Sequence, residues 1–499
     1  MNADVVVAGA GPVGLLTAAL LDAAGLSVQV FERNAGPSAH SKAITMHPRT
    51  LEALSTLEAG GQRLSEVLVE QGRPTPRAHF AVLPEMLDYS ALDTPYPFVL
   101  MIPQARTERI LADLLRERAV PVHYGQAVTG FEQDASAVRV RVGDAAYEAR
   151  YLVAADGGHS LLRGLAGIDF PGSPPTTAGF TADVELADPP AAPQHRWHRD
   201  TGSLSIVPLP DGQYRIFGTE AVDTGLAPDE VRKVRAEPLT LPELRAKVRR
   251  ITGTDCGIRD VFWSSWATDS TRHADRYRSG RVLLAGDAAH IHLPAGGQGM
   301  NVGMQDAANL CWKLAAEHHG WAPAHLVDGP FDYTHERQPI AARLAANTLA
   351  QGVLMNTFTP GVEALRTLFS DLIARGGDTA RELAGWLSGL DLAYPAPAGA
   401  HPLTGTRAPD LTLTGGTLLH ALRQDRFVLA DFTPEQRFAG LGSPRVDVRS
   451  ARPRPGAWSE LEAALIRPDG YTAVATGSAS PDELSAVVAE WTTPGCRDR

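Results

Sequence analysis

The sequence predicts an α/β protein with an N-terminal parallel sheet, an inserted antiparallel sheet and a separate C-terminal α/β segment. The opening stretch "DVVVAG" is a β-branched run typical of a buried parallel strand. A helical stretch, "PVGLLTAALLDAAG", and a second strand, "SVQVFER", complete a βαβ unit. From about residue 176 the pattern changes to alternating strands. We therefore divide the chain into residues 1–175, 176–275, 276–390 and 391–499.

The later elements follow in order. A second helix is predicted to begin at Arg49, in "RTLEALSTLEAGG", and residues 74–100 have the character of irregular or edge-strand structure. "IPQARTERILADLLRER" predicts another helix, followed by short strands and a hairpin. In the insertion, which is predicted to be strand-rich, Asp211-Gly212 marks a turn. After "RVLLAGD" and a glycine-rich loop, helices continue to the Pro/Gly-rich linker "AYPAPAGAHPLTGTRAP".

The composition indicates a soluble globular protein. The chain has 499 residues, 44% of them hydrophobic and 21% charged, which suits roughly two to four domains. A net charge of −11 argues against nonspecific binding to nucleic acid or an anionic membrane. There is no apolar run of about 18 residues and no signal-peptide pattern, so we expect a cytoplasmic protein. The three cysteines lack metal-like spacing, which is consistent with reduced thiols.

A glycine turn follows the first strand. Gly9, Gly11 and Gly14 form G-x-G-x-x-G, and Glu32 ends the next strand. Gly9 permits a tight turn, Gly11 lets a pyrophosphate approach the backbone, and Gly14 lets the helix pack closely. The helix N-terminus favours an anion, and Glu32 is placed to bind a ribose diol. A turn without a ligand is the structural alternative. The order of strand, glycine turn and helix, with an acidic residue at the end of the next strand, favours a dinucleotide. Because Glu32 would repel a 2′-phosphate, we expect FAD or NAD.

The stretch "LLAGDAAHIHLPAGGQGMN", residues 283–301, allows three interpretations. Asp287, His290 and His292 could ligate a metal, but no Cys or acidic cluster stands nearby, so we predict no metal site. A purely structural strand–loop–helix corner is the second interpretation. The third, which we favour, is a second cofactor-binding element in which Asp287 bonds a polyol hydroxyl such as that of a ribityl chain.

The glycines and the helix start of this stretch suit a flavin ring. Gly296, Gly297 and Gly299 would let the backbone come close to a flat ring. The N–H groups of Met300 and Asn301 would face the N1–C2=O edge of an isoalloxazine. Negative charge accumulates at that edge on reduction, and a helix N-terminus stabilises it.

Three motifs together resemble one family. "GDAAHIHLPAGGQGMNVGMQDAANLCWKLA" resembles the second FAD motif of the single-component aromatic hydroxylases, the class A flavoprotein monooxygenases. The first glycine turn is similar to that family's adenosine-phosphate site. "YLVAADGGHSLLRGLAG" resembles its Asp-Gly motif, on the positions Asp156, Gly157, Ser160 and Arg163. The motifs span about residues 1–315.

The resemblance implies an architecture. It is a glutathione-reductase-like FAD-binding βαβ domain with an inserted antiparallel-sheet substrate domain. Residues past 400 resemble the C-terminal thioredoxin-like domain of the phenol- and polyketide-hydroxylase branch. This segment has no cysteine before Cys496, so no thiol redox chemistry is expected there.

The resemblance also assigns further positions to FAD. Lys42, in "SKAITMHPRTLE", stands where an Arg that contacts the phosphate or ribityl chain is usual, and it supplies a point charge in place of a bidentate fork. Gln104 matches a glutamine near the ribityl chain, and Val128 matches a residue whose backbone meets the adenine. Gln104 could instead be a polar helix start, and Lys42 a solvated loop charge. The predicted cofactor-binding set is Gly9, Gly11, Val13, Gly14, Glu32, Arg33, Lys42, Gln104, Val128, Asp156, Asp287, Pro294, Gly297, Gly299, Met300 and Asn301.

The implied activity is that of an FAD- and NADPH- or NADH-dependent monooxygenase. A flavin C4a-hydroperoxide would transfer one oxygen atom of O₂ to an aromatic substrate, with a polycyclic polyketide favoured. Baeyer–Villiger insertion, antibiotic-inactivating hydroxylation and a non-catalytic flavin-binding module are the alternatives. No catalytic base can be named, and Asp156 and Arg163 could act in the nicotinamide step or only brace the sheet. A monomer or a homodimer is expected.

The substrate is expected to lie between the inserted sheet and the flavin face. An apolar slot with few charges favours a flat polycyclic or phenolic molecule. The aromatic and soft side chains that could line it are Tyr89, Phe98, Met101, Trp197, Phe217, Trp263 and Trp266.

Overall fold

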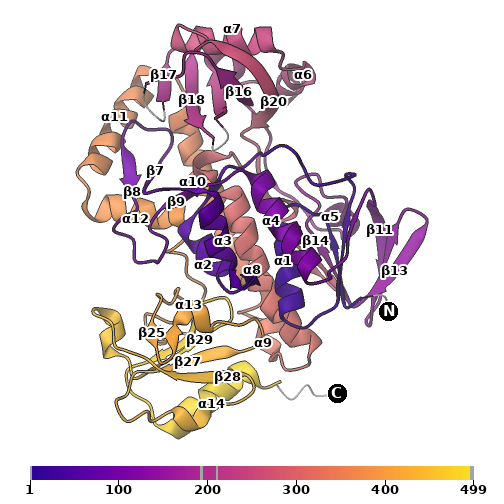
Figure 1. The fold of residues 1–499 in the computed structure, drawn as a ribbon, viewed down its shortest axis with the longest axis vertical. Helices are drawn as coiled ribbons and strands as arrows, with labels where there is room; N and C mark the ends of the chain where they lie inside the picture. The colour runs from indigo at the N-terminus through magenta and orange to yellow at the C-terminus, as the bar shows by residue number, and fades with distance from the viewer. Residues whose placement is uncertain (1–2, 192–194, 210–211, 495–499) are drawn as a thin grey trace.

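The computed structural model describes residues 3–191, 195–209 and 212–494. Figure 1 shows an antiparallel sheet at one end of the molecule, a C-terminal sheet at the other end, and long helices between them. Asp211 of the predicted turn and Cys496 lie outside the described residues. In the described part of the chain, no helix is both long enough and apolar enough to cross a membrane.

The two strands of the N-terminal βαβ unit, β1 and β2, belong to a six-stranded sheet of order β10-β2-β1-β14-β23-β22. Neighbouring strands are parallel except for the last pair, β23 and β22. The three central strands β1, β14 and β23 are buried along their whole length, which explains why their sequences are apolar without alternation. The strands are β1 (Val5–Ala8), β2 (Val28–Glu32), β10 (Val122–Tyr124), β14 (Tyr151–Ala154), β22 (Arg278–Ser279) and β23 (Val282–Leu284).

The first helix packs against two other helices beside this sheet. Helix α1 (Pro12–Ala23) contacts both α4 (Gln104–Glu117) and α8 (Gly299–His318). Pro12 stands at the first position of α1, where its fixed φ suits a helix start. Helix α8 is buried from Met300 to Ala316, so it has no solvent-facing polar stripe.

The helix predicted from Arg49 is shorter than expected. Helix α2 (Pro48–Leu54) ends early because β4 (Glu58–Ala59) and β5 (Gln62–Arg63) form a hairpin. Gly60 and Gly61 at its turn have φ values of +57° and +82°, which a helix cannot accommodate. The predicted helix through this turn is therefore wrong beyond Leu54.

Short elements lie before and after this hairpin and after the Asp-Gly motif. Segment 74–100 contains small strands, as its composition predicts, and a three-stranded meander follows α4. The elements are α3 (Leu64–Gln71), β3 (Thr45–Met46), β6 (Arg73–Thr75), β7 (Arg77–His79), β8 (Met86–Asp88), β9 (Val99–Met101), β11 (Val128–Gln133), β12 (Val138–Val142), β13 (Ala145–Ala149), α5 (Leu161–Leu165), β15 (Gly172–Ser173), β21 (Thr271–His273) and β24 (His290–Ile291).

A five-stranded antiparallel sheet of order β17-β18-β19-β16-β20 occupies the insertion. The insertion is strand-rich, as predicted, and it also contains two helices that were not predicted, α6 and α7. Both helices have a Pro in their first turn and an acidic residue, Glu230 or Glu243, that accepts from the N-cap backbone. Leu244 and Val248 of α7 pack on one face of the sheet. The elements are β16 (Ala178–Leu186), β17 (His195–Arg199), β18 (Gly202–Pro208), β19 (Tyr214–Glu220), β20 (Ile258–Thr268), α6 (Pro228–Ala236) and α7 (Leu241–Thr252).

Helices and a four-stranded mixed sheet complete the chain. The sheet has the order β28-β27-β29-β30, and its core includes Trp312 and Trp321 of the preceding helical region. The C-terminal segment therefore packs directly on α8. The elements are α9 (Ala324–Val327), α10 (Tyr333–Asn356), α11 (Pro360–Ala374), α12 (Gly377–Ser388), α13 (Leu418–Ala421), β25 (Thr412–Leu413), β26 (Gly416–Thr417), β27 (Phe427–Asp431), β28 (Val446–Ser450), β29 (Ala463–Ile466), β30 (Thr472–Thr476) and α14 (Pro481–Thr492).

Candidate functional site

The first glycine turn has two packed glycines and one open glycine. Gly9 has φ +109°, and a Cβ there would lie 2.3 Å from the carbonyl oxygen of Ala155. A Cβ on Gly14 would lie 1.9 Å from the carbonyl oxygen of Gly9. A Cβ on Gly11 would meet no atom within 4 Å. The turn is thus closed on the protein side and open at Gly11, as an approaching phosphate group requires.

Glu32 closes this turn from the neighbouring strand. One carboxylate oxygen accepts from the Ala10 N–H at 2.8 Å, and the other accepts from the backbone and side-chain N–H groups of Asn34 at 2.9 and 2.6 Å. Gln126 donates its backbone N–H to the Glu32 carbonyl, which brings the start of β11, at half-buried Val128, near the same edge. A carboxylate held in this way keeps lone pairs for a diol. Arg33 beside it is exposed.

The first glycine turn, residues 9–14, and the second glycine-rich corner, residues 283–301, are in contact. Val13, the second residue of α1, packs so closely on the second corner that a Cβ on Gly286 would lie 3.0 Å from its Cγ2. A Cβ on Gly303 of α8 would lie 2.8 Å from the same atom. An extended ligand at Gly11 therefore needs little further length to reach the second corner.

Asp287 stands out at the second corner because its neighbours Gly286 and Ala288 are buried while it is exposed. Burial by the surrounding protein nevertheless raises the pKa of its carboxyl, and the charges of His290 and Lys42 oppose that rise. Lys42, which is also exposed, is close enough to act on Asp287 electrostatically.

The glycine loop before α8 is pressed against the segment that precedes α2. Gly297 has φ +66°, and a Cβ there would lie 2.1 Å from Thr45 Oγ1. The Asn301 side chain accepts from the His47 N–H at 2.7 Å and donates to the carbonyls of Gly297 and Thr45 at 2.9 and 3.1 Å. Its amide therefore holds the loop in place.

The start of α8 presents free backbone donors. The first helical hydrogen bond runs from Val302 N–H to the Gln298 carbonyl at 2.9 Å, and no side chain caps the helix. The N–H groups of Gly299, Met300 and Asn301 precede that bond, so they point out of the helix at its positive end. Pro294, at the beginning of the loop, is exposed. These donors suit the electron-rich edge of a flavin.

Gln104 and residues of the Asp-Gly motif form hydrogen bonds within the protein. Gln104 accepts from the Ala43 N–H at 3.1 Å and donates to Glu108 at 2.7 Å, which fixes the segment that carries Lys42. Arg163 donates to the Ala288 carbonyl at 2.9 Å, next to Asp287. Asp156 accepts from the Leu162 N–H at 3.3 Å, and its other oxygen is buried without a partner.

The histidines of the second corner have protein partners. His290 Nε2 lies 2.7 Å from Asp306 Oδ2, and His292 Nδ1 lies 2.7 Å from the Leu293 carbonyl. Among the residues that the structure describes, no three His, Cys, Asp or Glu side chains are grouped to hold a metal ion.

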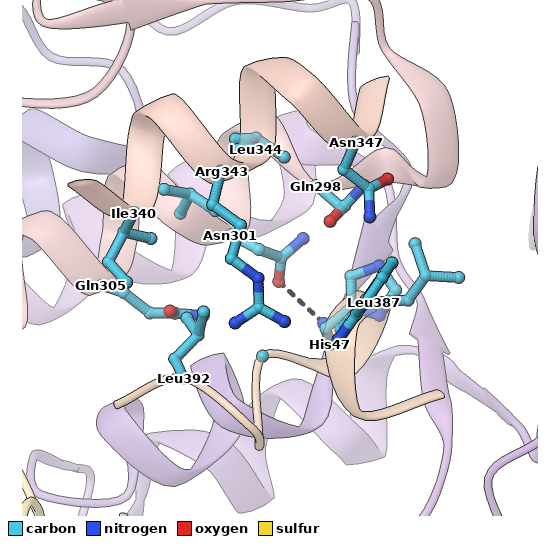
Figure 2. Close-up of a pocket in the computed structure, with 13 residues that line it drawn as sticks. His47, Gln298, Asn301, Gln305, Ile340, Arg343, Leu344, Asn347, Leu387 and Leu392 are labelled. Atoms are coloured by element: carbon cyan, nitrogen blue, oxygen red, sulfur yellow. Dashed lines mark hydrogen bonds between the residues drawn. The ribbon is translucent and has the colours of Figure 1, made fainter. Parts of the chain in front are cut away.

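His47 lies beside the glycine loop, and no sequence motif marks it as a site residue. Its ring nitrogen Nε2 lies 2.8 Å from the Gly296 carbonyl, and it borders a cavity between α8, α10 and α12 (Figure 2). The Arg343 guanidinium projects into that cavity from α10. Burial lowers the pKa of His47 to about 4, so the ring is neutral at pH 7.

Acid should destabilise the protein through His47. The folded pKa of about 4 lies below the unfolded value of 6.5, so stability falls as pH drops from 6.5 to 4, by about 3 kcal/mol in total. We expect His47→Gln, which can still donate to Gly296, to lose most of this dependence in urea unfolding at pH 7 and 4.5. His420→Gln, at an exposed histidine, is the control. An unchanged pH slope in His47→Gln would contradict the prediction.

The inserted sheet has two different faces. Trp197 and Trp266 pack with the α7 cluster, so the expectation that they line the flavin side is wrong. Trp263 lies on the other face, where its ring is 5.1 Å from the Arg215 guanidinium carbon. Phe217 packs on the apolar cluster between this face and α12.

The remaining predicted slot residues lie in the interior. Tyr89 and Met101 are buried in the same apolar cluster as Phe217, and the Phe98 ring meets that of Tyr96 edge-on at 6.3 Å.

The sequence profile of the FAD binding domain family matches residues 2–348, and that of the C-terminal region of aromatic-ring hydroxylases matches residues 401–494. The chain belongs to the FAD-dependent aromatic-ring hydroxylases. It is a flavin-dependent monooxygenase, and its mixed α/β fold is that of the family. The predicted family, its enzyme class and the FAD cofactor are confirmed.

Named relatives of this hydroxylase match it over nearly the whole chain. The 12-dehydrotetracycline 5-monooxygenase/anhydrotetracycline 6-monooxygenase of Streptomyces rimosus is 40% identical, with 99% of each chain covered. The rifampicin monooxygenase of Streptomyces venezuelae is 36% identical, with 94% of each covered. The solved structure of OxyS anhydrotetracycline hydroxylase from Streptomyces rimosus superposes with a TM-score of 0.86 at 40% identity, with 99% of each chain covered.

Proposed function

We propose that this hydroxylase adds one oxygen atom from O₂ to a polycyclic aromatic polyketide, with NADPH or NADH as the reductant. The observation that carries the proposal is the contact between the two glycine corners through Val13, since it puts both ends of one long cofactor in reach. Relatives named for tetracycline and rifampicin oxygenation support the substrate class.

Each of the predicted residues would contact a different part of FAD. Gly11 would leave room for the pyrophosphate. Glu32 would accept hydrogen bonds from the ribose diol, and Asp287 would accept one from a ribityl hydroxyl. The N–H groups at the start of α8 would stabilise negative charge at the pyrimidine edge. When bound, FAD supplies the electron transfer and the oxygen activation. The other residues assigned to the same site are Gly9, Val13, Gly14, Arg33, Lys42, Gln104, Val128, Asp156, Pro294, Gly297, Gly299, Met300 and Asn301.

The substrate would lie on the flavin-facing side of the inserted sheet. Phe217 and Trp263 offer apolar and aromatic area there, and the surrounding buried cluster excludes water. We name no general base, because a phenol can lose its proton through its own acidity and solvent.

The finer architecture is also proposed. Residues 1–175 and 276–390 form a glutathione-reductase-like FAD-binding domain, and 176–275 form the substrate domain. Residues 391–499 form a thioredoxin-like domain, which the mixed four-stranded sheet with α13 and α14 supports.

The test is a turnover assay. Purified protein with FAD, NADPH or NADH, O₂ and a panel of aromatic polyketides including anhydrotetracycline should consume reductant only when an aromatic is present. The product should carry one atom of ¹⁸O from ¹⁸O₂. A ring-expanded lactone would indicate Baeyer–Villiger insertion instead of hydroxylation, and loss of antibacterial activity would indicate drug inactivation. Bound FAD with no aromatic-dependent consumption of reductant would overturn the proposed substrate class.

A further inference from the structure

Helix α8 connects the cofactor corner to the C-terminal segment through buried charges. Asp306, two turns into the helix, is completely buried, and both of its oxygens are used. Oδ2 accepts from the Gly286 N–H at 3.2 Å and lies 2.7 Å from His290 Nε2. Asp306 thus holds both ends of the turn that carries Asp287.

Arg337 of α10 holds Asp306 from the other side. Its Nε donates to Asp306 Oδ1 at 2.7 Å, and Nη2 donates to the Val302 carbonyl, in the first turn of α8, at 3.0 Å. Its Nη1 donates to the Tyr394 hydroxyl at 3.2 Å. Because the guanidinium is planar and fully buried, these three bonds fix the helix start, the carboxylate and Tyr394 relative to one another.

The C-terminal segment supplies the next layer. The ring of Tyr394, in the linker before this segment, lies against that of Tyr471, with centroids 4.2 Å apart and planes tilted by 37°, and the Arg467 guanidinium carbon lies 4.9 Å from the Tyr394 ring. Arg467 binds both oxygens of Glu336, the neighbour of Arg337, at 2.6 and 2.8 Å. Arg467 also pairs with Asp469, so it bridges two buried carboxylates, and Glu336 is shared with Lys313 of α8, whose Nζ lies 2.6 Å from Glu336 Oε2.

We propose that the C-terminal segment, residues 401–494, is part of the cofactor site, with Arg337 as a positioning residue. Arg467 and Tyr471 fix Glu336 and Tyr394, these fix Arg337, and Arg337 sets Asp306 and hence the turn from Gly286 to His290. The segment thereby acts on FAD without touching it. The inference rests on the proposed FAD site.

Tyr394→Phe is the mildest test. It removes the hydroxyl that accepts from Arg337 and keeps the ring contact with Tyr471, so the fold should survive. We expect the FAD dissociation constant to rise about threefold to tenfold, which is less than the full loss of a hydrogen bond to a charged group because Arg337 acts on FAD only through Asp306. The visible circular dichroism of bound flavin should also change, because the turn at Asp287 shifts.

Arg467→Lys and Arg337→Lys are the stronger variants, each keeping the charge and losing the fork. Arg278→Lys is the matched control, since Arg278 pairs with Glu317 at the opposite end of the same helix at 2.7 Å. All three should lower Tm, but only the first two should weaken FAD binding and alter the flavin spectrum at temperatures where each protein is folded.

The experiment uses FAD alone, without substrate or reductant. If wild type binds FAD, and if Tyr394→Phe and both lysine variants bind it as tightly as Arg278→Lys does, the C-terminal segment is only structural and the inference is wrong. If wild type itself binds no FAD, the proposed function fails first. The two failures are therefore distinguishable.

Discussion

Gly11→Ala is expected to abolish tight FAD binding while leaving the fold intact. Gly11 has φ −74° and ψ 179°, which alanine adopts freely, and the added methyl would meet no protein atom within 4 Å. The same methyl would occupy the space that the pyrophosphate needs. We expect the FAD dissociation constant to rise by about two orders of magnitude, and Tm of the apoprotein to stay within about 1 °C.

Gly14→Ala should fail differently. Its methyl would lie 1.9 Å from the Gly9 carbonyl oxygen, a backbone atom that cannot move without disturbing β1 and α1. Overpacking of this kind costs about 1–3 kcal/mol or more, so both stability and FAD binding should be lost. Gly361→Ala, on α11 with the same open surroundings as Gly11, is the control and should change neither.

These variants are compared by FAD fluorescence titration and by thermal unfolding of the apoproteins. A Gly11→Ala protein that binds FAD as wild type does would mean that no phosphate approaches the turn. An unstable Gly11→Ala apoprotein would mean that the turn is tighter than the structure shows.

The parts that sequence predicts well are the local ones. The strand, turn and helix around Gly9, Gly11 and Gly14 are encoded within about twenty residues, and their packing matches the roles that the spacing indicates. The strand and glycine loop before α8 are similarly local. Single-sequence periodicity is reliable there because neighbouring residues determine the backbone.

The sequence-based predictions fail where distant residues meet. Asn301 holds the His47 backbone across 254 positions, and Arg467 pairs with Glu336 across 131, so no local pattern marks either contact. Trp266 was assigned to the wrong face because alternation separates the two faces of a strand without saying which one is covered. The missed helix α7, by contrast, has a readable signal in Thr240 and Glu243, a capping pair.

Arg215→Met is expected to destabilise the protein by about 3–5 kcal/mol, because it leaves the buried Asp183 carboxylate without its partner. Arg215 of the inserted sheet is 2% exposed. Its Nε and Nη2 donate to Asp183 at 2.5 and 2.9 Å. It also donates to the carbonyls of Ser41 and Lys42 at 2.5 and 3.0 Å. One side chain therefore connects the inserted sheet to the segment that carries Lys42, close to Asp287.

A double variant separates these two roles. Arg215→Met with Asp183→Leu removes both charges, and replacing a whole buried pair with apolar groups is often neutral, so urea unfolding should recover most of the lost stability. The bonds to Ser41 and Lys42 stay absent in the double variant. Its FAD dissociation constant should therefore remain raised by about tenfold, because the segment that carries Lys42 has lost two hydrogen bonds, of which only part of the energy reaches the cofactor. If the stable double variant bound FAD with wild-type affinity, the segment that carries Lys42 would keep its position without Arg215. The contacts of Arg215 would then have no effect on FAD binding.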